Sequence, residues 1–139
     1  MRWQLPLVAT LALVATVGCG DDDPPTGPTT SIYGTYQLVS VDGVQVPAPF
    51  PPPIEGAVIM DGALTLNFNS SVKFSLTVET SSGEIDASSL DGVVEQTGDA
   101  FDFVFDDGDG TPSRATGTLS GSTMSFVWYW EEYVYSFVK

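Results

Sequence analysis

Apolar and polar residues alternate along most of the chain after residue 31. Leu64, Leu66 and Phe68 alternate with small or polar residues, and the same period of two recurs between residues 72 and 78. Such alternation places apolar side chains on one face of a β-strand and polar side chains on the other. No stretch shows a convincing repeat at helical spacing, so we predict an all-β domain. The predicted strands cover residues 34–41, 57–68, 71–80, 90–97, 100–106, 113–120, 123–130 and 132–138.

Short polar segments separate these strands and are typical of tight antiparallel connections. Residues 69–70, 97–99, 106–111, 121–122 and 131–132 are rich in Gly, Asn, Asp, Ser and Glu. Eight sequential antiparallel strands form a meander, and a meander removes its exposed edges most simply by closing on itself. We therefore predict a small up-and-down β-barrel. A two-sheet β-sandwich is the alternative architecture.

Large aromatic side chains dominate the predicted inner face of the barrel. Each such side chain buries about 150–250 Å², so together they would occupy much of an eight-stranded interior. We expect a largely filled core, and a pre-formed cavity for a small apolar ligand is the alternative. The predicted core or ligand cluster is Phe68, Phe74, Phe101, Phe103, Phe105, Phe126 and Trp128.

The N-terminal segment has the pattern of an export signal. Arg2 precedes an uncharged apolar run over residues 5–17, and Gly18 and Cys19 follow directly. A membrane-spanning helix needs about 20 apolar residues, so this run is too short for a comfortable permanent span. Residues 20–31 contain three prolines and no large apolar side chain, which predicts an extended, disordered tether.

Residues 16–19, with the letters TVGC, resemble the lipobox of bacterial lipoprotein signals. The resemblance implies that Cys19 is lipidated and becomes the mature N-terminus, which would anchor the protein at a membrane of the bacterial cell envelope. In a cell with two membranes, this would be the outer membrane or the periplasmic face. The implied organisation is a signal peptide over residues 1–18, a lipidated tether over 19–31 and a domain over 32–139. Ordinary cleavage nearby is the alternative.

Charge and composition exclude several functions. The chain has 18 acidic and 4 basic residues, a net charge of -14, no histidine and one cysteine. The negative charge disfavours a nucleic-acid partner. Without histidine, the chain lacks the commonest general base and the commonest zinc ligand, and no paired carboxylates or Gly-rich phosphate loop stand out. We therefore expect a protein without catalytic residues, metal or cofactor, which is a monomer and reaches the membrane only through its lipid.

The domain itself resembles the small lipocalin-like domains of bacterial envelope lipoproteins. The resemblance is carried by residues 34–38 (GTYQL), residues 41–43 (VDG), the succession of Gly-centred turns and an aromatic last strand that runs to Lys139. It implies a barrel that could hold a small apolar ligand. No family ligand residue can be transferred, because no position matches a defined binding motif.

Three further segments have two interpretations each. Residues 106–111 (DDGDGT) look like a calcium loop, but the EF-hand spacing fails at both ends, so we expect a plain polar turn. Residues 47–53 are proline-rich and should lie outside the strands, with Phe50 closing one barrel mouth or docking into a partner. Residues 128–130 (WYW) place Trp128 in the core and Tyr129 outside or at a rim, or form an exposed patch for protein or carbohydrate.

These observations predict a lipid-anchored, non-enzymatic accessory protein of the cell envelope. The alternatives are a carrier of a small apolar ligand inside the barrel, and a module that binds an envelope protein or a carbohydrate.

Overall fold

A computed structural model describes residues 31–139, which form an all-β domain. The predicted signal peptide, the lipidation of Cys19 and all of the tether except Ser31 lie outside the described residues. The part of the chain that the structure covers has no helix with the length and apolarity to cross a membrane. The strands are β1 (Gly34–Val41), β2 (Val44–Gln45), β3 (Ala48–Pro49), β4 (Val58–Leu66), β5 (Ser71–Glu79), β6 (Ile85–Thr97), β7 (Ala100–Asp106), β8 (Ser113–Ser120), β9 (Thr123–Trp128) and β10 (Tyr135–Val138).

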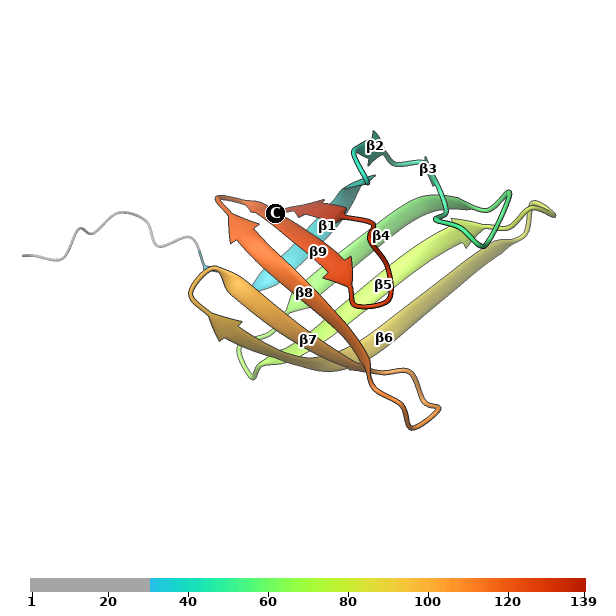
Figure 1. Cartoon of the computed structure of the whole chain (residues 1–139). Helices are drawn as coiled ribbons and strands as arrows, with labels where there is room; N and C mark the ends of the chain where they lie inside the picture. The colour runs from blue at the N-terminus through green and yellow to red at the C-terminus, as the bar shows by residue number, and fades with distance from the viewer. Residues whose placement is uncertain (1–30) are drawn as a thin grey trace, which may run out of the picture. The chain divides into compact units, whose positions relative to one another are not determined.

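The sheet closes on itself as an up-and-down barrel (Figure 1). From β4 to β10, each strand pairs antiparallel with its neighbour in sequence, and β10 pairs with β1. The barrel closes because β1 also pairs with β4, from Gly34 opposite Leu66 to Gln37 opposite Ala63. The two-residue strands β2 and β3 extend the sheet beyond this closure. The predicted eight-stranded barrel is thus confirmed, and the β-sandwich alternative is wrong.

The strand boundaries differ from the prediction at several places. β4 ends at Leu66 and β9 at Trp128, each two residues early, and β10 begins only at Tyr135. β6 begins at Ile85, well before the predicted residue 90. The expectation that all of residues 47–53 lie outside the strands is wrong, because Pro49 pairs with Val58. The short strand β3 lies at the sheet edge, where the missing N–H of proline does not interrupt a central ladder.

Small residues on the inner face make room for the large ones. A Cβ atom added to Gly92 would lie 2.3 Å from the carbonyl oxygen of Val104 and 2.9 Å from the Cα of Phe105. At Gly117, an added Cβ would lie 2.8 Å from the ring of Phe103. Interiors of small barrels commonly alternate small and large side chains in this way. The glycines therefore allow the aromatic rings to lie directly against the barrel wall.

The two ends of the barrel differ in their connections (Figure 1). We call the end of the barrel where β1 begins and β10 ends the near end, and the opposite end the far end. The near end has the tight turns at residues 67–70, 98–99 and 121–122. The far end has the longer connections at residues 42–57, 80–84, 107–112 and 129–134. At the near end, the ammonium group of Lys139 donates hydrogen bonds to the carbonyl oxygens of Ser31 and Tyr33. The last residue thus fastens the first described residues to the barrel.

Candidate binding surface at the far end of the barrel

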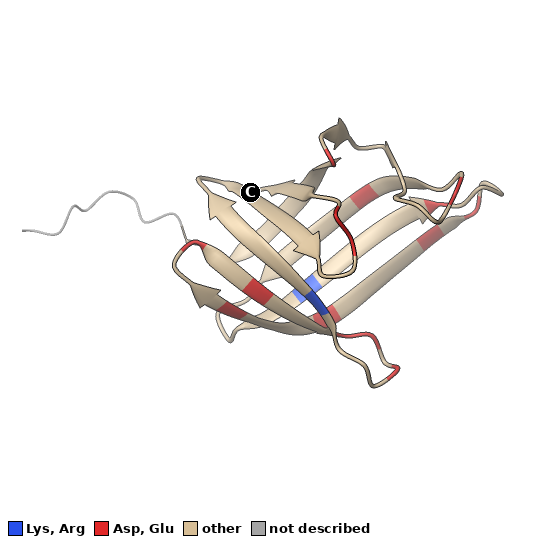
Figure 2. Ribbon diagram, viewed as in Figure 1, with Lys and Arg blue, Asp and Glu red and all other residues tan. Residues whose placement is uncertain are grey.

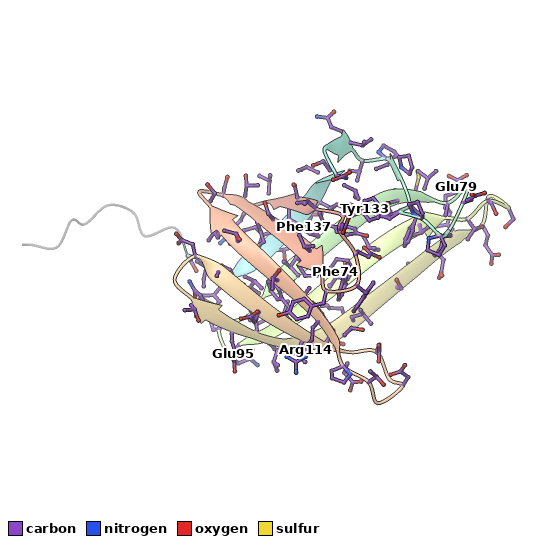
Figure 3. All side chains as sticks on the ribbon, viewed as in Figure 1. Phe74, Glu79, Glu95, Arg114, Tyr133 and Phe137 are labelled. Atoms are coloured by element: carbon purple, nitrogen blue, oxygen red, sulfur yellow. The ribbon has the colours of Figure 1, made fainter. Side chains whose placement is uncertain are left out.

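Aromatic rings occupy the middle of the barrel. The ring centroid of Phe126 lies 5.3 Å from those of Phe74 and Phe103 and 4.9 Å from that of Trp128. Phe74 of β5 and Phe137 of β10, both labelled in Figure 3, are buried in this interior with their ring centroids 6.2 Å apart. Six members of the predicted cluster are buried and contiguous in one core: Phe74, Phe101, Phe103, Phe105, Phe126 and Trp128.

Phe68 does not belong to this core, so its assignment to the inner cluster is wrong. Its side chain is 83% exposed and lies in the turn at residues 67–70, where its ring centroid is 4.4 Å from that of Tyr33. The strand ends earlier than the alternation suggests, because the Asn67 amide donates to the carbonyl oxygen of Ser71. The chain therefore turns before Phe68 can face inward.

Two buried tyrosines complete the core, and their hydroxyl groups have partners. The Tyr36 hydroxyl donates to the carbonyl oxygen of Ile32 at 2.7 Å, and the Tyr135 hydroxyl donates to Oε2 of Glu131 at 3.1 Å. Burial raises the pKa of both phenols, and the negative charge of Glu131 raises the pKa of Tyr135 further. Both phenols therefore stay protonated up to a higher pH than an exposed tyrosine does.

At the far end, a stack of two indole rings leads from the core to the surface. Trp128 is buried, whereas Trp130 is 59% exposed, and the two ring centroids lie 4.7 Å apart at an interplanar angle of 19°. Tyr129 faces outward, and its hydroxyl donates to Oδ1 of Asp102 at 3.3 Å. Trp128 thus belongs to the core as predicted, while Tyr129 and Trp130 are exposed; a binding role for this pair stays a prediction.

The proline-rich connection covers another part of the far end. Phe50 is partly buried and packs against the core, and its amide donates to the carbonyl oxygen of Ala57 at 2.9 Å. Beside it is a hollow of about 300 Å³. The lining residues of the hollow are Phe50, Ile54, Ala57, Val78, Thr80, Ser81, Asp86 and Ser88. As predicted for Phe50, this connection contributes an apolar side chain to one mouth of the barrel.

The acidic connection between β7 and β8 uses its carboxylates to hold its own turn. Oδ1 of Asp106 accepts a hydrogen bond from the Gly108 amide at 2.9 Å, and Oδ2 of Asp107 accepts one from the Ser113 hydroxyl at 2.8 Å. The hydrogen bond from Ser113 lowers the pKa of Asp107. Within residues 31–139, no group of three or more His, Cys, Asp or Glu side chains is arranged to hold a metal ion.

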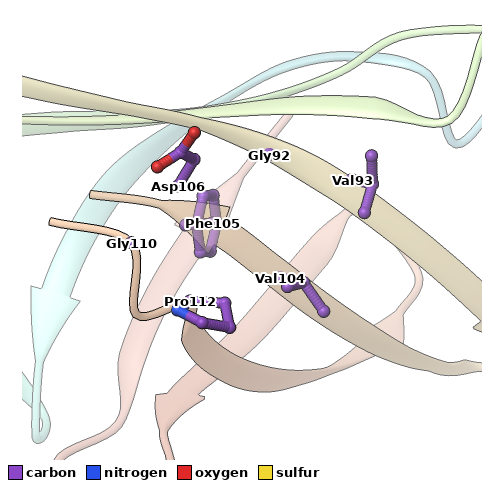
Figure 4. A pocket seen from close by; sticks show the side chains of 7 residues that line it. All are labelled: Gly92, Val93, Val104, Phe105, Asp106, Gly110 and Pro112. Carbon is purple, nitrogen blue, oxygen red and sulfur yellow. The ribbon is translucent and has the colours of Figure 1, made fainter. Parts of the chain in front are cut away.

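A surface groove of about 370 Å³ lies where β6 and β7 separate (Figure 4). Val93, Val104 and Pro112 provide its exposed apolar surface, whereas the Phe105 side chain is fully buried. The other lining residues are Gly92, Asp106 and Gly110. Sequence reasoning missed this groove, because it depends on where the two strands part rather than on any motif.

Comparison with known proteins returned no protein-family model, no curated protein and no solved structure that matches this chain. The functional proposal therefore depends on the residues of this chain alone.

Proposed function

We propose that this chain is a lipid-anchored, non-enzymatic accessory protein of the bacterial cell envelope that binds a partner at the far end of its barrel. The observation that carries the binding role is the aromatic filling of the interior together with the exposed indole of Trp130. A filled interior favours a role for the surface over the transport of an enclosed ligand. Exposed aromatic side chains are frequent at sites that bind other molecules.

The anchoring role is supported by the sequence that ends at Cys19. Each acyl methylene buried in a bilayer contributes about 0.8 kcal/mol, so two or more chains on one residue hold a soluble domain stably at a membrane. Such an anchor needs no basic surface. It is therefore compatible with a chain whose net charge is -14.

The distribution of charge supports an orientation with the near end toward the lipid. In the described domain, the three near-end turns contain one acidic residue, Asp99. Anionic lipids repel acidic surfaces, and the exposed ring of Phe68 at the near end suits a bilayer interface. Acidic residues gather instead on and beside the far-end connections (Figure 2). They are Asp42, Glu55, Glu79, Glu84, Asp86, Asp106, Asp107, Asp109, Glu131 and Glu132.

The test compares the wild-type chain with Cys19→Ser in a bacterial host. Mass spectrometry of the mature N-terminal peptide is expected to show an acylated Cys19 in the wild type, which should fractionate with membranes. Cys19→Ser should lose both properties. Phe68→Ser is the matched control, because it alters the near end without touching the modified thiol, and it should remain acylated. An unmodified wild-type peptide in the soluble fraction would refute the anchoring role.

A further inference from the structure

The first part of β6 has a partner on one side only. β6 pairs with β5 from Ile85 to Val93, but its pairing with β7 begins at Asp91, opposite Asp106. Beyond Asp106 the chain leaves the sheet through the connection at residues 107–112. Figure 1 shows β6 continuing past the end of β7 toward the far end. Within the described domain, residues 85–90 therefore form an open strand edge.

The register identifies which backbone groups face this open edge. The Val94 amide donates to the carbonyl oxygen of Ser70, just before β5, and the Thr80 amide after β5 donates to that of Glu84. Backbone groups of successive residues point to alternate sides of an antiparallel strand. Even-numbered residues of this strand therefore bond toward β5. The N–H and C=O groups of Ile85, Ala87 and Ser89 point away from it.

The open edge lacks most of the features that usually protect such edges. Exposed edge strands are commonly blocked by lysine, proline, a bulge or a covering loop. Residues 85–90 (IDASSL) contain one charged residue, Asp86, and no proline, and the register with β5 is regular throughout. The side chains of the three open-side residues are uncharged, and Ile85 is 58% exposed. Another extended chain could therefore approach this edge closely.

We propose that the open edge of β6 binds an extended, basic segment of a partner protein by β-strand addition. Backbone hydrogen bonds to residues 85, 87 and 89 would provide the pairing, as in other complexes formed by strand addition. The groove lined by Val93, Val104 and Pro112 begins where the open edge ends, so it offers an apolar site for one partner side chain. This inference rests on the proposed binding role of the far end and is independent of lipid anchoring.

The charges around the edge determine the kind of partner. Six carboxylates flank the open edge and the groove, so a segment rich in lysine or arginine is favoured by electrostatic complementarity. A second copy of this chain is disfavoured, because pairing two β6 edges would bring two sets of the same acidic residues together. The flanking residues are Glu84, Asp86, Asp91, Asp106, Asp107 and Asp109.

The test uses the full chain in detergent and a short labelled peptide of alternating lysine and valine. Ser89→Pro removes an N–H group on the open side, and Ser89→Ala is the matched control that keeps it. We expect the wild type and Ser89→Ala to bind the peptide equally. Ser89→Pro should bind about tenfold more weakly, because it loses one backbone hydrogen bond and obstructs the edge. The N–H of residue 89 is not bonded to β5, so the proline variant should keep the far-UV spectrum of the wild type.

Hydrogen exchange on the wild type gives a second, independent readout. The peptide should slow exchange at the amides of Ile85, Ala87 and Ser89. Equal binding by both variants, unchanged exchange at these amides, or equal binding of an alternating glutamate and valine peptide would each overturn the proposal. Protection of the same amides without peptide, together with a dimer in solution, would assign the edge to a second copy of the chain instead. Acylation of Cys19 is measured separately, so failure of this inference and failure of the anchoring role are distinguishable.

Discussion

Replacing Phe126 by alanine tests whether aromatic rings hold the barrel together from inside. The Phe126 side chain is fully buried. Truncating a buried phenylalanine costs about 3–5 kcal/mol, depending on how far the surroundings can collapse into the space. The surrounding strands are joined in a closed hydrogen-bonded barrel, so collapse is limited, and we expect a loss of about 4 kcal/mol. The neighbouring rings are Phe74, Phe103, Phe105, Trp128, Tyr135 and Phe137, all with centroids within 6.2 Å of Phe126.

The matched control is Phe68→Ala, which removes the same atoms from an exposed turn. Its expected cost is less than about 1 kcal/mol, because the main loss is one ring contact with Tyr33. Urea unfolding followed by far-UV circular dichroism measures both free energies of unfolding. The urea dependence of that free energy should be similar for both variants. A loss below about 1.5 kcal/mol for Phe126→Ala, or equal losses for the two variants, would refute the idea of a tightly filled interior.

Three further predictions concern the core and the near end. Gly92→Ala should lower the free energy of unfolding by about 3 kcal/mol, measured by urea unfolding, because the added Cβ would overlap the carbonyl oxygen of Val104. The pKa of Tyr135 is raised in the folded state. The free energy of unfolding should therefore fall as the pH rises above about 10, where the phenol ionises first in the unfolded chain. Tyr135→Phe should show a shallower fall of that free energy with pH. Lys139→Met should speed proteolysis near Tyr33, because the lysine fastens that segment, and unchanged cleavage would contradict this.

Alternation predicts the barrel well wherever one strand face is buried. In β7 the buried positions are all phenylalanine and the more exposed positions include Asp102 and Asp106, and its observed bounds match the predicted ones. The same pattern fails at Phe68, because Asn67 and Ser70 form a turn that competes with the strand. If the alternation of β4 continued, the side chain of residue 68 would point into the barrel, but the chain has already left the sheet there. The period of two in apolar and polar residues does not by itself indicate where a strand ends.

The alternation of apolar and polar residues does not predict the first part of β6, for the opposite reason. Residues 85–89 pair with β5 along a regular ladder, yet their side chains are exposed on both faces. Asp86 and Ser88 occupy the alternate positions of β6 that face the interior side of the sheet. They lie beyond the core, however, at the hollow beside Phe50. No burial enforces alternation there, so the sequence carries no strand signal. The open edge and the groove at Gly92 therefore became visible only in three dimensions.

Native mass spectrometry of the protein extracted from cell envelopes tests most directly whether the barrel is an anchored binding domain with a filled interior. The expected mass is that of the chain starting at Cys19 with its acyl groups and no further small molecule. Retention of one apolar molecule per chain, released on gentle activation, would contradict a filled interior and indicate a carrier.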